Sequence, residues 1–456
     1  LFSKYFNVFF SFLHRTHVVI SLILLISLNL FSQESSETNS PATNAKTGWT
    51  FGLVPVVSYN SDLGFQYGGL VNFYNYGDGS SFPKYKHSIY AEVSRYTKGS
   101  GIYRLFYDSE FLIPKIRLTA DLSYLPDQAL DFYGFNGYDA VYNPNFQNES
   151  STEYITRMYY KHQRDILRLK LDFQGATGAK NLRWVAGYEL MDMQIGSVPI
   201  DKLNKGKDPE DMLPNVPNLF DNYVNWGIIN QNEKDGGWHN SIKLGTVYDT
   251  RDNEACPMKG IWSELVIFNS FSKNFTFGKI ALTHRQYFTI IPNDFSFAYR
   301  LAYQANVYGK SPFYMLPYMV YSYMPSSSID GLGGSKTIRG LIRNRVVGDG
   351  VVYGNLEFRY KFVRFKFIKQ NWYIALNPFL DAGMVVQKTK IDKTGIPNIV
   401  DQSLFFKDNA ESVHLTYGCG LHIALNENFV IAADIGLPVK KEDGKMGIYI
   451  GMNWLF

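Results

Sequence analysis

The chain alternates apolar and polar residues over most of its length, from residue 49 to residue 456. The segment 412–425 shows this most clearly: its odd positions, from Val413 to Leu425, are mostly large and apolar, and its even positions are polar or small. A period of two residues is that of a β-strand with one face in an apolar environment. The alternation recurs in segments that turns separate, so it predicts strands throughout this region.

We expect sixteen strands. They lie at 49–59, 62–75, 86–97, 101–112, 115–124, 162–174, 181–193, 238–249, 260–271, 276–290, 295–308, 350–362, 371–385, 412–425, 428–437 and 446–456. A soluble β-sandwich needs strands of only about five or six residues. Longer alternating strands in an even number are typical of a transmembrane barrel, which closes on itself because every backbone group in hydrocarbon needs an internal partner. The predicted fold is therefore all-β, a 16-stranded antiparallel outer-membrane barrel.

The lengths of the connections predict the orientation of this barrel. If the first strand starts on the periplasmic side, the turns on that side are mostly short, such as 113–114 and 291–294. The long connections then all lie outside, at 125–161, 194–237, 309–349 and 386–411. Short periplasmic turns and long external loops are the usual arrangement. Within the sixth external connection, the apolar run 312–323 is expected to fill the lumen or its mouth, and a membrane-surface or partner contact is the alternative.

Composition excludes several other classes of protein. Aromatic residues make up 16% and charged residues 19% of the chain, whereas soluble proteins carry about 25% charged residues. Beyond residue 31 there is no apolar run of about 20 residues, as a helical membrane protein would need. A net charge of +4 does not indicate nucleic-acid binding, and two cysteines outside any Cys/His cluster indicate neither a disulfide framework nor a zinc site.

The two ends of the chain carry export signals. Residues 1–32 have a basic start, an apolar stretch and small residues after it, so we expect a signal peptide there, followed by a polar linker at 33–48. The last strand has aromatic or apolar residues at the spacing of the C-terminal β-signal of outer-membrane proteins, and in it Met446, Ile448, Ile450, Met452, Trp454 and Phe456 are expected to face lipid. The residues assigned to this signal are Tyr449, Gly451, Trp454 and Phe456.

Three stretches together point to one family. Residues 331–341 read GLGGSKTIRGL, residues 354–360 read GNLEFRY, and residues 379–383 read FLDAG. This set resembles the barrel-assembly and two-partner-secretion superfamily, the BamA/TamA-like bacterial surface antigen barrels. The resemblance implies that the sixth external loop folds into the lumen and that its tip pairs with two acidic residues of the barrel wall. The tip here would be Ile338, Arg339, Gly340 and Leu341, where Leu341 replaces an aromatic residue, and its partners would be Glu357 and Asp381.

The alternation of the two strands supports this pairing. Glu357 alternates with the apolar Leu356 and Phe358, and Asp381 follows the apolar Leu380, so both carboxylates are expected to face the lumen. The planar guanidinium of Arg339 can engage two carboxylates at once. Buried charges are costly unless they are paired, which favours a closed cluster of the three.

A fourth stretch, between strands eight and nine, resembles a turn of the same family. It contains YDTRDN at 248–253 and PMKG at 257–260. Asp and Asn side chains stabilise such turns by bonding to nearby backbone. The residues concerned are Asp249, Arg251, Asp252, Asn253 and Gly260, and their expected role is structural.

The resemblance covers the barrel and no more. Family members that insert or secrete proteins carry periplasmic POTRA repeats before the barrel, and we expect none between the signal peptide and residue 49. The expected partners are outer-membrane lipid and a periplasmic or outer-membrane protein that supplies the POTRA function, without nucleic acid.

The sequence offers no catalytic motif. The segment 331–337 lacks the glycine before lysine of a phosphate loop, and His414 and His422 lack a nucleophile at a motif spacing. We therefore expect a non-enzymatic barrel with no catalytic residue, cofactor or metal. The resemblance implies a role in the insertion, assembly or translocation of outer-membrane or exported proteins. A passive pore or a structural subunit of a larger outer-membrane complex is the alternative.

Overall fold

The computed structural model describes residues 46–82, 84–254, 256–323, 330–367, 370–425 and 429–456. The predicted signal peptide and the linker up to residue 45 lie outside the described residues.

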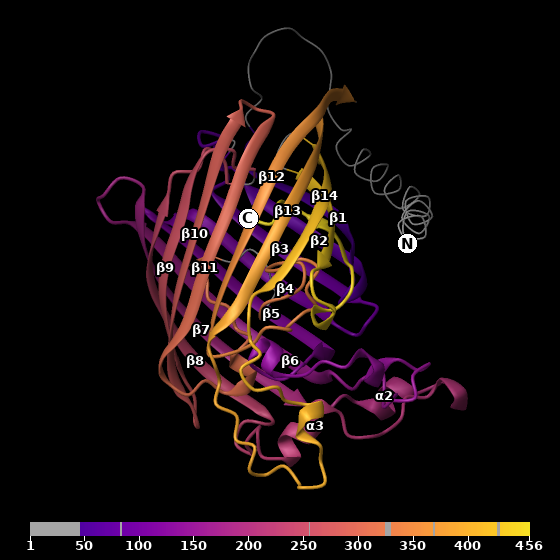
Figure 1. The fold of residues 1–456 in the computed structure, drawn as a ribbon. Coiled ribbons are helices and arrows are strands. Elements are labelled where there is room, and N and C mark those ends of the chain that lie inside the picture. Colours follow the sequence, from indigo (N-terminus) through magenta and orange to yellow (C-terminus); the bar gives the residue numbers. More distant parts are fainter. Residues whose placement is uncertain (1–45, 83, 255, 324–329, 368–369, 426–428) are drawn as a thin grey trace.

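Sixteen strands form one closed barrel in the described parts of the chain, and each is antiparallel to its neighbours (Figure 1). Strand order follows the sequence, and β16 closes the barrel against β1. This confirms the predicted fold class. The strands are β1 (Trp49–Asn60), β2 (Gly64–Asn75), β3 (His87–Tyr96), β4 (Gly101–Ile113), β5 (Ile116–Asp131), β6 (Lys161–Ala176), β7 (Leu182–Gly196), β8 (Gly236–Asp249), β9 (Gly260–Phe271), β10 (Thr276–Ile291), β11 (Phe295–Gly309), β12 (Gly350–Phe367), β13 (Gln370–Gln387), β14 (His414–Leu425), β15 (Phe429–Pro438) and β16 (Gly447–Met452).

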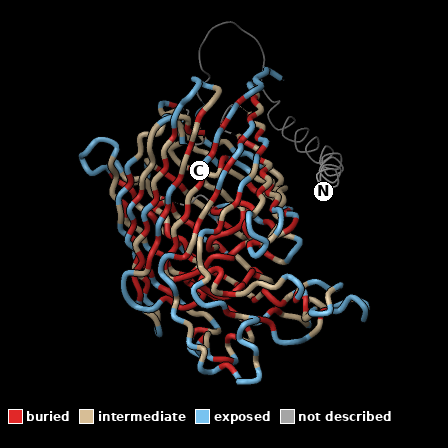
Figure 2. Tube along the Cα trace, in the orientation of Figure 1, coloured by how far each residue is buried: buried red, intermediate tan, exposed pale blue. Residues whose placement is uncertain are grey.

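The two faces of the strands differ as the alternation predicts, and buried and exposed residues alternate along the wall (Figure 2). On β6, Leu167 and Leu169 are exposed on the outer surface, while Arg168 and Lys170 are buried inside. The buried charges form ion pairs between strands, some of them adjacent and some separated by one strand. These pairs include Arg104–Asp121 at 2.7 Å, Lys243–Asp172 at 2.6 Å and Arg285–Glu264 at 2.5 Å.

Most strand ends lie within three residues of the sequence-based boundaries, and three differ by four residues or more. β5 continues to Asp131 and β12 to Phe367, in both cases beyond a shift in strand register. β16 stops at Met452 instead of running to residue 456, because Asn453 adopts a left-handed conformation with φ of 68°. Asn tolerates this region better than most residues and here it ends the strand.

The long connections gather at one end of the barrel, at the bottom of Figure 1, and share an aromatic core. Phe132, Tyr159, Tyr223, Trp226 and Phe313 belong to this core and come from different connections. Short helices lie in these loops: η1 (Gly137–Asp139), η2 (Pro144–Gln147), α2 (Ile200–Asn204), η3 (Pro209–Asp211), α3 (Leu219–Asn225), η4 (Phe313–Met315), η5 (Gln402–Leu404) and η6 (Lys441–Asp443). None of the helices in the described parts of the chain has the length and apolar character needed to cross a bilayer.

The apolar run 312–323 lies against the inner wall. Its carbonyl groups accept hydrogen bonds from inward lysines, with Lys279 Nζ 2.6 Å from the Met315 oxygen and Lys243 Nζ 3.0 Å from the Tyr321 oxygen. The Tyr318 hydroxyl donates to Glu189 on β7 at 2.6 Å. The run therefore contacts inward-facing side chains of β7, β8 and β10.

The junction between β1 and β16 is the weakest strand pairing described. β1 pairs with β2 from Trp49 to Asn60, but toward β16 only Tyr59 and Asn60 are paired. Ser61 adds a backbone hydrogen bond to Ile448 just beyond the strand. In the described chain, residues 49–58 of β1 therefore have no strand partner on the β16 side. We call this junction the seam.

Candidate functional site

The centre of the site is Arg339, in the connection between β11 and β12. Its side chain is 1% exposed and its guanidinium binds both oxygens of Asp381 on β13. The distances are 2.9 Å from Nε to Oδ2 and 3.1 Å from Nη2 to Oδ1, and the Arg339 backbone nitrogen also donates to Oδ2 at 3.0 Å. This two-pronged contact fixes both the position and the orientation of the guanidinium.

Two further carboxylates complete the cluster. Arg339 Nη1 lies 2.8 Å from Glu357 Oε1 on β12 and 3.2 Å from Asp434 Oδ2 on β15. The ring of Phe379 lies beneath the guanidinium, with its centroid 3.5 Å away, in the range of a cation–π contact. The structure thus brings together Arg339, Glu357 and Asp381, the three residues that the sequence analysis singled out, and adds Asp434.

Backbone contact holds the tip against the wall. Gly340 has a φ of 91°, and a Cβ atom there would lie 2.6 Å from the carbonyl carbon of Gly436 on β15. A Cβ atom on Gly436 would meet Arg339 equally closely, at 2.6 Å. The loop and strand can approach this closely only because both residues are glycine.

The apolar residues of the tip pack against the barrel wall. Ile338 and Leu341 are fully buried, and they pack in one cluster with Tyr353 and Val385 of the barrel wall. Leu341 therefore occupies an apolar position, although the family pattern has an aromatic residue there. The Tyr449 hydroxyl on β16 accepts a hydrogen bond from the Gly340 nitrogen at 3.1 Å, which ties the tip to the last strand.

Two chains of contacts lead from this cluster to the end of the protein. Glu357 also binds Arg359 at 2.7 Å, and Arg359 Nη2 donates to the Phe456 oxygen at 2.6 Å. Asp434 also lies 2.9 Å from His422 Nε2, and the His422 ring lies against Trp454 with centroids 4.2 Å apart.

These contacts correct one expectation about the last strand. Trp454 and Phe456 are buried inside the barrel at 6% and 9% exposure, and they do not face lipid. The reason is the turn at Asn453, which directs the last residues into the lumen. Tyr449 also points inward, whereas Met452 stays exposed on the outer face.

The turn between β8 and β9 is held by its own side chains. Arg251 binds Asp249 at 2.7 Å, and Asp252 Oδ1 accepts hydrogen bonds from the backbone nitrogens of residues 258 and 259. Asn253 accepts from the Cys256 nitrogen at 3.0 Å. Gly260 has a φ of 110°, and a Cβ atom there would lie 2.3 Å from the Thr250 oxygen. All five predicted turn residues thus lie in one local structure. This turn connects β8 and β9, whereas the Arg339 cluster involves β12, β13 and β15.

Sequence reasoning missed some members of the site. Asp434 lies on β15, outside the three stretches that identified the other residues, and only the closure of the barrel brings it beside Arg339. Arg343, which binds Asp127 at 2.7 Å and Asp131 at 3.0 Å, was missed as well. The inward alternation of β15 placed Asp434 on the lumen face, and this was the one signal available for it.

The ion pairs and the burial of the cluster suit it to holding the loop in place. Its acids are paired with arginine or histidine and are buried, so they offer no free acid or base to a substrate. Across the described residues, no group of three or more His, Cys, Asp or Glu side chains is placed to hold a metal ion. What the arrangement can do is fix the loop between β11 and β12 to β12, β13 and β15, beside the seam.

Comparison with known proteins gives a family and two similar folds. The sequence matches the Omp85 superfamily domain over residues 87–455. BamA from Haemophilus ducreyi lacking POTRA domains 1–3 matches with a TM-score of 0.51 and 14% identity, over 90% of this chain and 71% of that one. CdiB from Escherichia coli matches with a TM-score of 0.50 and 8% identity, over 90% of this chain and 63% of that one, so this chain spans less than two thirds of CdiB. At such identities the likeness is one of fold. No curated protein sequence matches the chain.

Proposed function

Because this chain belongs to the Omp85 superfamily, we propose that it inserts, assembles or translocates outer-membrane or exported proteins. Homologous barrels of this superfamily are outer-membrane proteins that transport or assemble other proteins without catalysis. The proposal places this chain in a bacterial outer membrane, exported through its N-terminal segment, with the long connections outside the cell.

The incomplete seam is the observation that supports this function most. Residues 49–58 of β1 have no strand partner toward β16 in the described chain. Unpaired backbone groups are unfavourable in a membrane and form a template for another strand. An extended segment of a substrate protein could therefore pair with β1 by strand addition.

The Arg339 cluster has a positioning role in this proposal. It holds the loop between β11 and β12 next to the seam, and its contacts reach the last residues through Arg359 and His422. We propose that the tip keeps β15 and β16 in place while the β1 edge is open. The partners in this function are outer-membrane lipid and a periplasmic or outer-membrane protein that delivers substrates, as POTRA repeats do elsewhere in the family.

Depletion of the protein tests the proposal. We expect quantitative proteomics of outer membranes to show the loss of a defined set of barrel or exported proteins, and the wild-type gene to restore them. A variant with Arg157→Ala, a change in an exposed loop residue whose side chain pairs with the exposed Glu149, should restore them as well. An unchanged outer-membrane proteome after depletion would contradict the proposal.

The alternative, a passive pore or structural subunit, is tested on the purified barrel. The loop residues packed inside the wall support a closed lumen, so we expect single-channel recordings without a steady open conductance. Steady conductance together with an unchanged proteome would favour the pore.

A further inference from the structure

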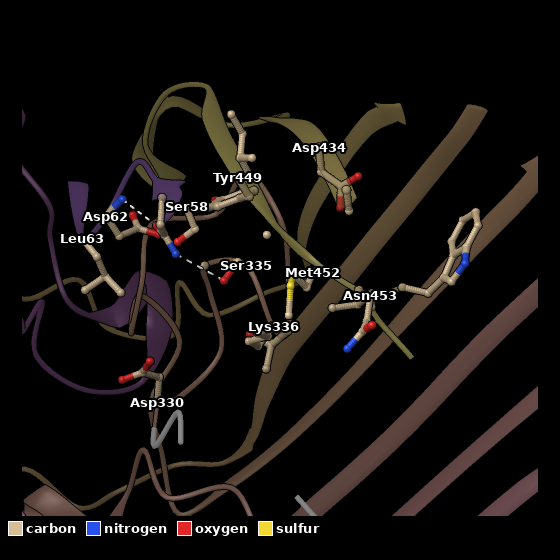
Figure 3. Close-up of a pocket in the computed structure, with 18 of the residues that line it drawn as sticks. Ser58, Asp62, Leu63, Asp330, Ser335, Lys336, Asp434, Tyr449, Met452 and Asn453 are labelled. Carbon is tan, nitrogen blue, oxygen red and sulfur yellow. Dashed lines mark hydrogen bonds between the residues drawn. The ribbon is translucent and has the colours of Figure 1, made fainter. Parts of the chain in front are cut away.

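A cavity of about 2280 Å³ lies behind the seam (Figure 3). One part of its lining is polar and faces the lumen, and it includes Arg300, Lys336 and Asp434. Another part is apolar and belongs to β14, β15 and β16, and it includes Leu421, Ile450 and Met452. The cavity therefore joins a polar interior to an apolar outer surface through the gap beside β1.

The apolar mouth of this cavity opens toward the membrane. Ile448, Ile450 and Met452 alternate with the buried Tyr449, so they lie on the outer face of β16, and Met452 is 48% exposed. Leu421 on β14 is also exposed on this face. A molecule that reaches this mouth directly, by lateral diffusion, is a lipid, because the outer face of a barrel is surrounded by lipid.

The polar part contains a lysine that forms no direct ion pair with any described residue. The side chain of Lys336 lines the cavity (Figure 3) and is exposed to its interior, and within the described residues its ammonium group has neither an ion pair nor a hydrogen-bond partner. The buried arginines around it have partners: Arg300 binds Asn355 at 2.8 Å, and Arg339 binds three carboxylates. Desolvation lowers the pKa of Lys336, and an anion beside the ammonium group would favour its charged form.

Among the described residues no acid of the cavity forms an ion pair with Lys336, although the charge of Asp434 attracts it. Asp434 is engaged by Arg339 and His422. Asp62 lies elsewhere along the lining, against Gly334, and burial raises the pKa of its carboxyl to about 6. A single unpaired cation at the inner end of an apolar opening is suited to a molecule with an anionic head and an apolar tail.

We propose that this cavity binds a lipid with an anionic headgroup, held by Lys336, whose acyl chains pass out beside β1 and lie along the outer face of β14 to β16. This binding does not depend on the function proposed above. Because a charge-assisted hydrogen bond is stronger than a neutral one, the preference for an anionic headgroup should be about tenfold.

Native mass spectrometry of the full chain in detergent tests the proposal with two probes of equal acyl chains. Wild type should bind phosphatidylglycerol about tenfold more tightly than phosphatidylcholine. Lys336→Gln should abolish this preference and Lys336→Arg should keep it. Lys205→Gln, at an exposed loop lysine, is the matched control and should bind as wild type does. Equal binding of phosphatidylglycerol by wild type and Lys336→Gln would overturn the proposal.

A second variant and a third probe test the apolar half independently. Met452→Trp enlarges a side chain at the mouth and should weaken the binding of both lipids without removing the headgroup preference. Glycerol phosphate has the anionic group but no acyl chain, and it should not compete with phosphatidylglycerol. Effective competition by glycerol phosphate, or by an acidic peptide, would show that the cavity takes a free anion or a polypeptide, and would refute a lipid site.

Discussion

At the scale of the residue, the buried charge of Arg339 is stabilised by the acidic side chains around it. It is fully buried, and Glu357, Asp381 and Asp434 surround it, so the cluster holds more acids than this one guanidinium neutralises. Arg359 and His422 supply further positive or hydrogen-bonding groups on the far side of two of those acids. Loss of Arg339 would leave Glu357 with its contact to Arg359 and Asp434 with its contact to His422, and would remove the ion pair of Asp381.

Replacement of this arginine should destabilise the barrel. Arg339→Ala leaves three buried carboxylates without their shared partner, and breaking a buried ion pair costs about 3–5 kcal/mol. We expect the folded barrel to lose its heat resistance at a lower temperature on a semi-native gel. Arg157→Ala, which breaks an exposed pair with Glu149, is the control and should leave the transition unchanged. Unchanged heat resistance in Arg339→Ala would mean that the cluster contributes nothing to stability.

At the scale of the element, the loop between β11 and β12 depends on its contact with β15. The approach of Gly340 to Gly436 lets the loop backbone lie directly on the strand, and the side chains of Ile338 and Leu341 then reach the apolar cluster. The end of a strand is also set by a single residue, because β16 ends where Asn453 adopts a left-handed conformation. Small residues and turn residues therefore decide where each element can lie.

A methyl group at the tip tests this contact. Gly340→Ala would place a Cβ atom 2.6 Å from the backbone of Gly436, at a φ that alanine disfavours. We expect a loss of about 1–3 kcal/mol in stability from overpacking, read as a lower unfolding midpoint in urea. Gly451→Ala is the matched control in the neighbouring strand, because a Cβ atom there meets nothing within 4 Å. If both variants unfold at the wild-type midpoint, the tip does not lie against β15.

At the scale of the whole molecule, the barrel combines a well-paired wall with one weak junction. β1 has twelve paired residues toward β2 and two toward β16. The last residues turn into the lumen instead of extending this junction, and there they meet Arg359 and His422. The loop tip, the final residues and the seam are therefore neighbours in space, although they are far apart in sequence.

Locking the seam should abolish the proposed function. Tyr59 and Ile450 are direct cross-strand partners, a geometry that suits a disulfide. With both native cysteines replaced by serine, the double variant Tyr59→Cys and Ile450→Cys should fail under oxidising conditions to restore the proteins lost on depletion, and a reductant should restore activity. The pair Phe51→Cys and Phe73→Cys, between β1 and β2, is the control and should stay active when oxidised. An active oxidised seam would show that β1 and β16 need not separate.

The alternation of apolar and polar residues by itself determined the sixteen strands, their order and their two faces. This was possible because the register of a strand with one apolar face is set by neighbouring residues in the chain. It also placed Glu357 and Asp381 on the lumen side. Only the tertiary structure decided three other features. These are the contact of Asp434 with Arg339, the inward turn of Trp454 and Phe456, and the cavity beside Lys336. They depend on barrel closure and on the path of a long loop, and the residues involved come together from distant parts of the sequence that no local pattern connects.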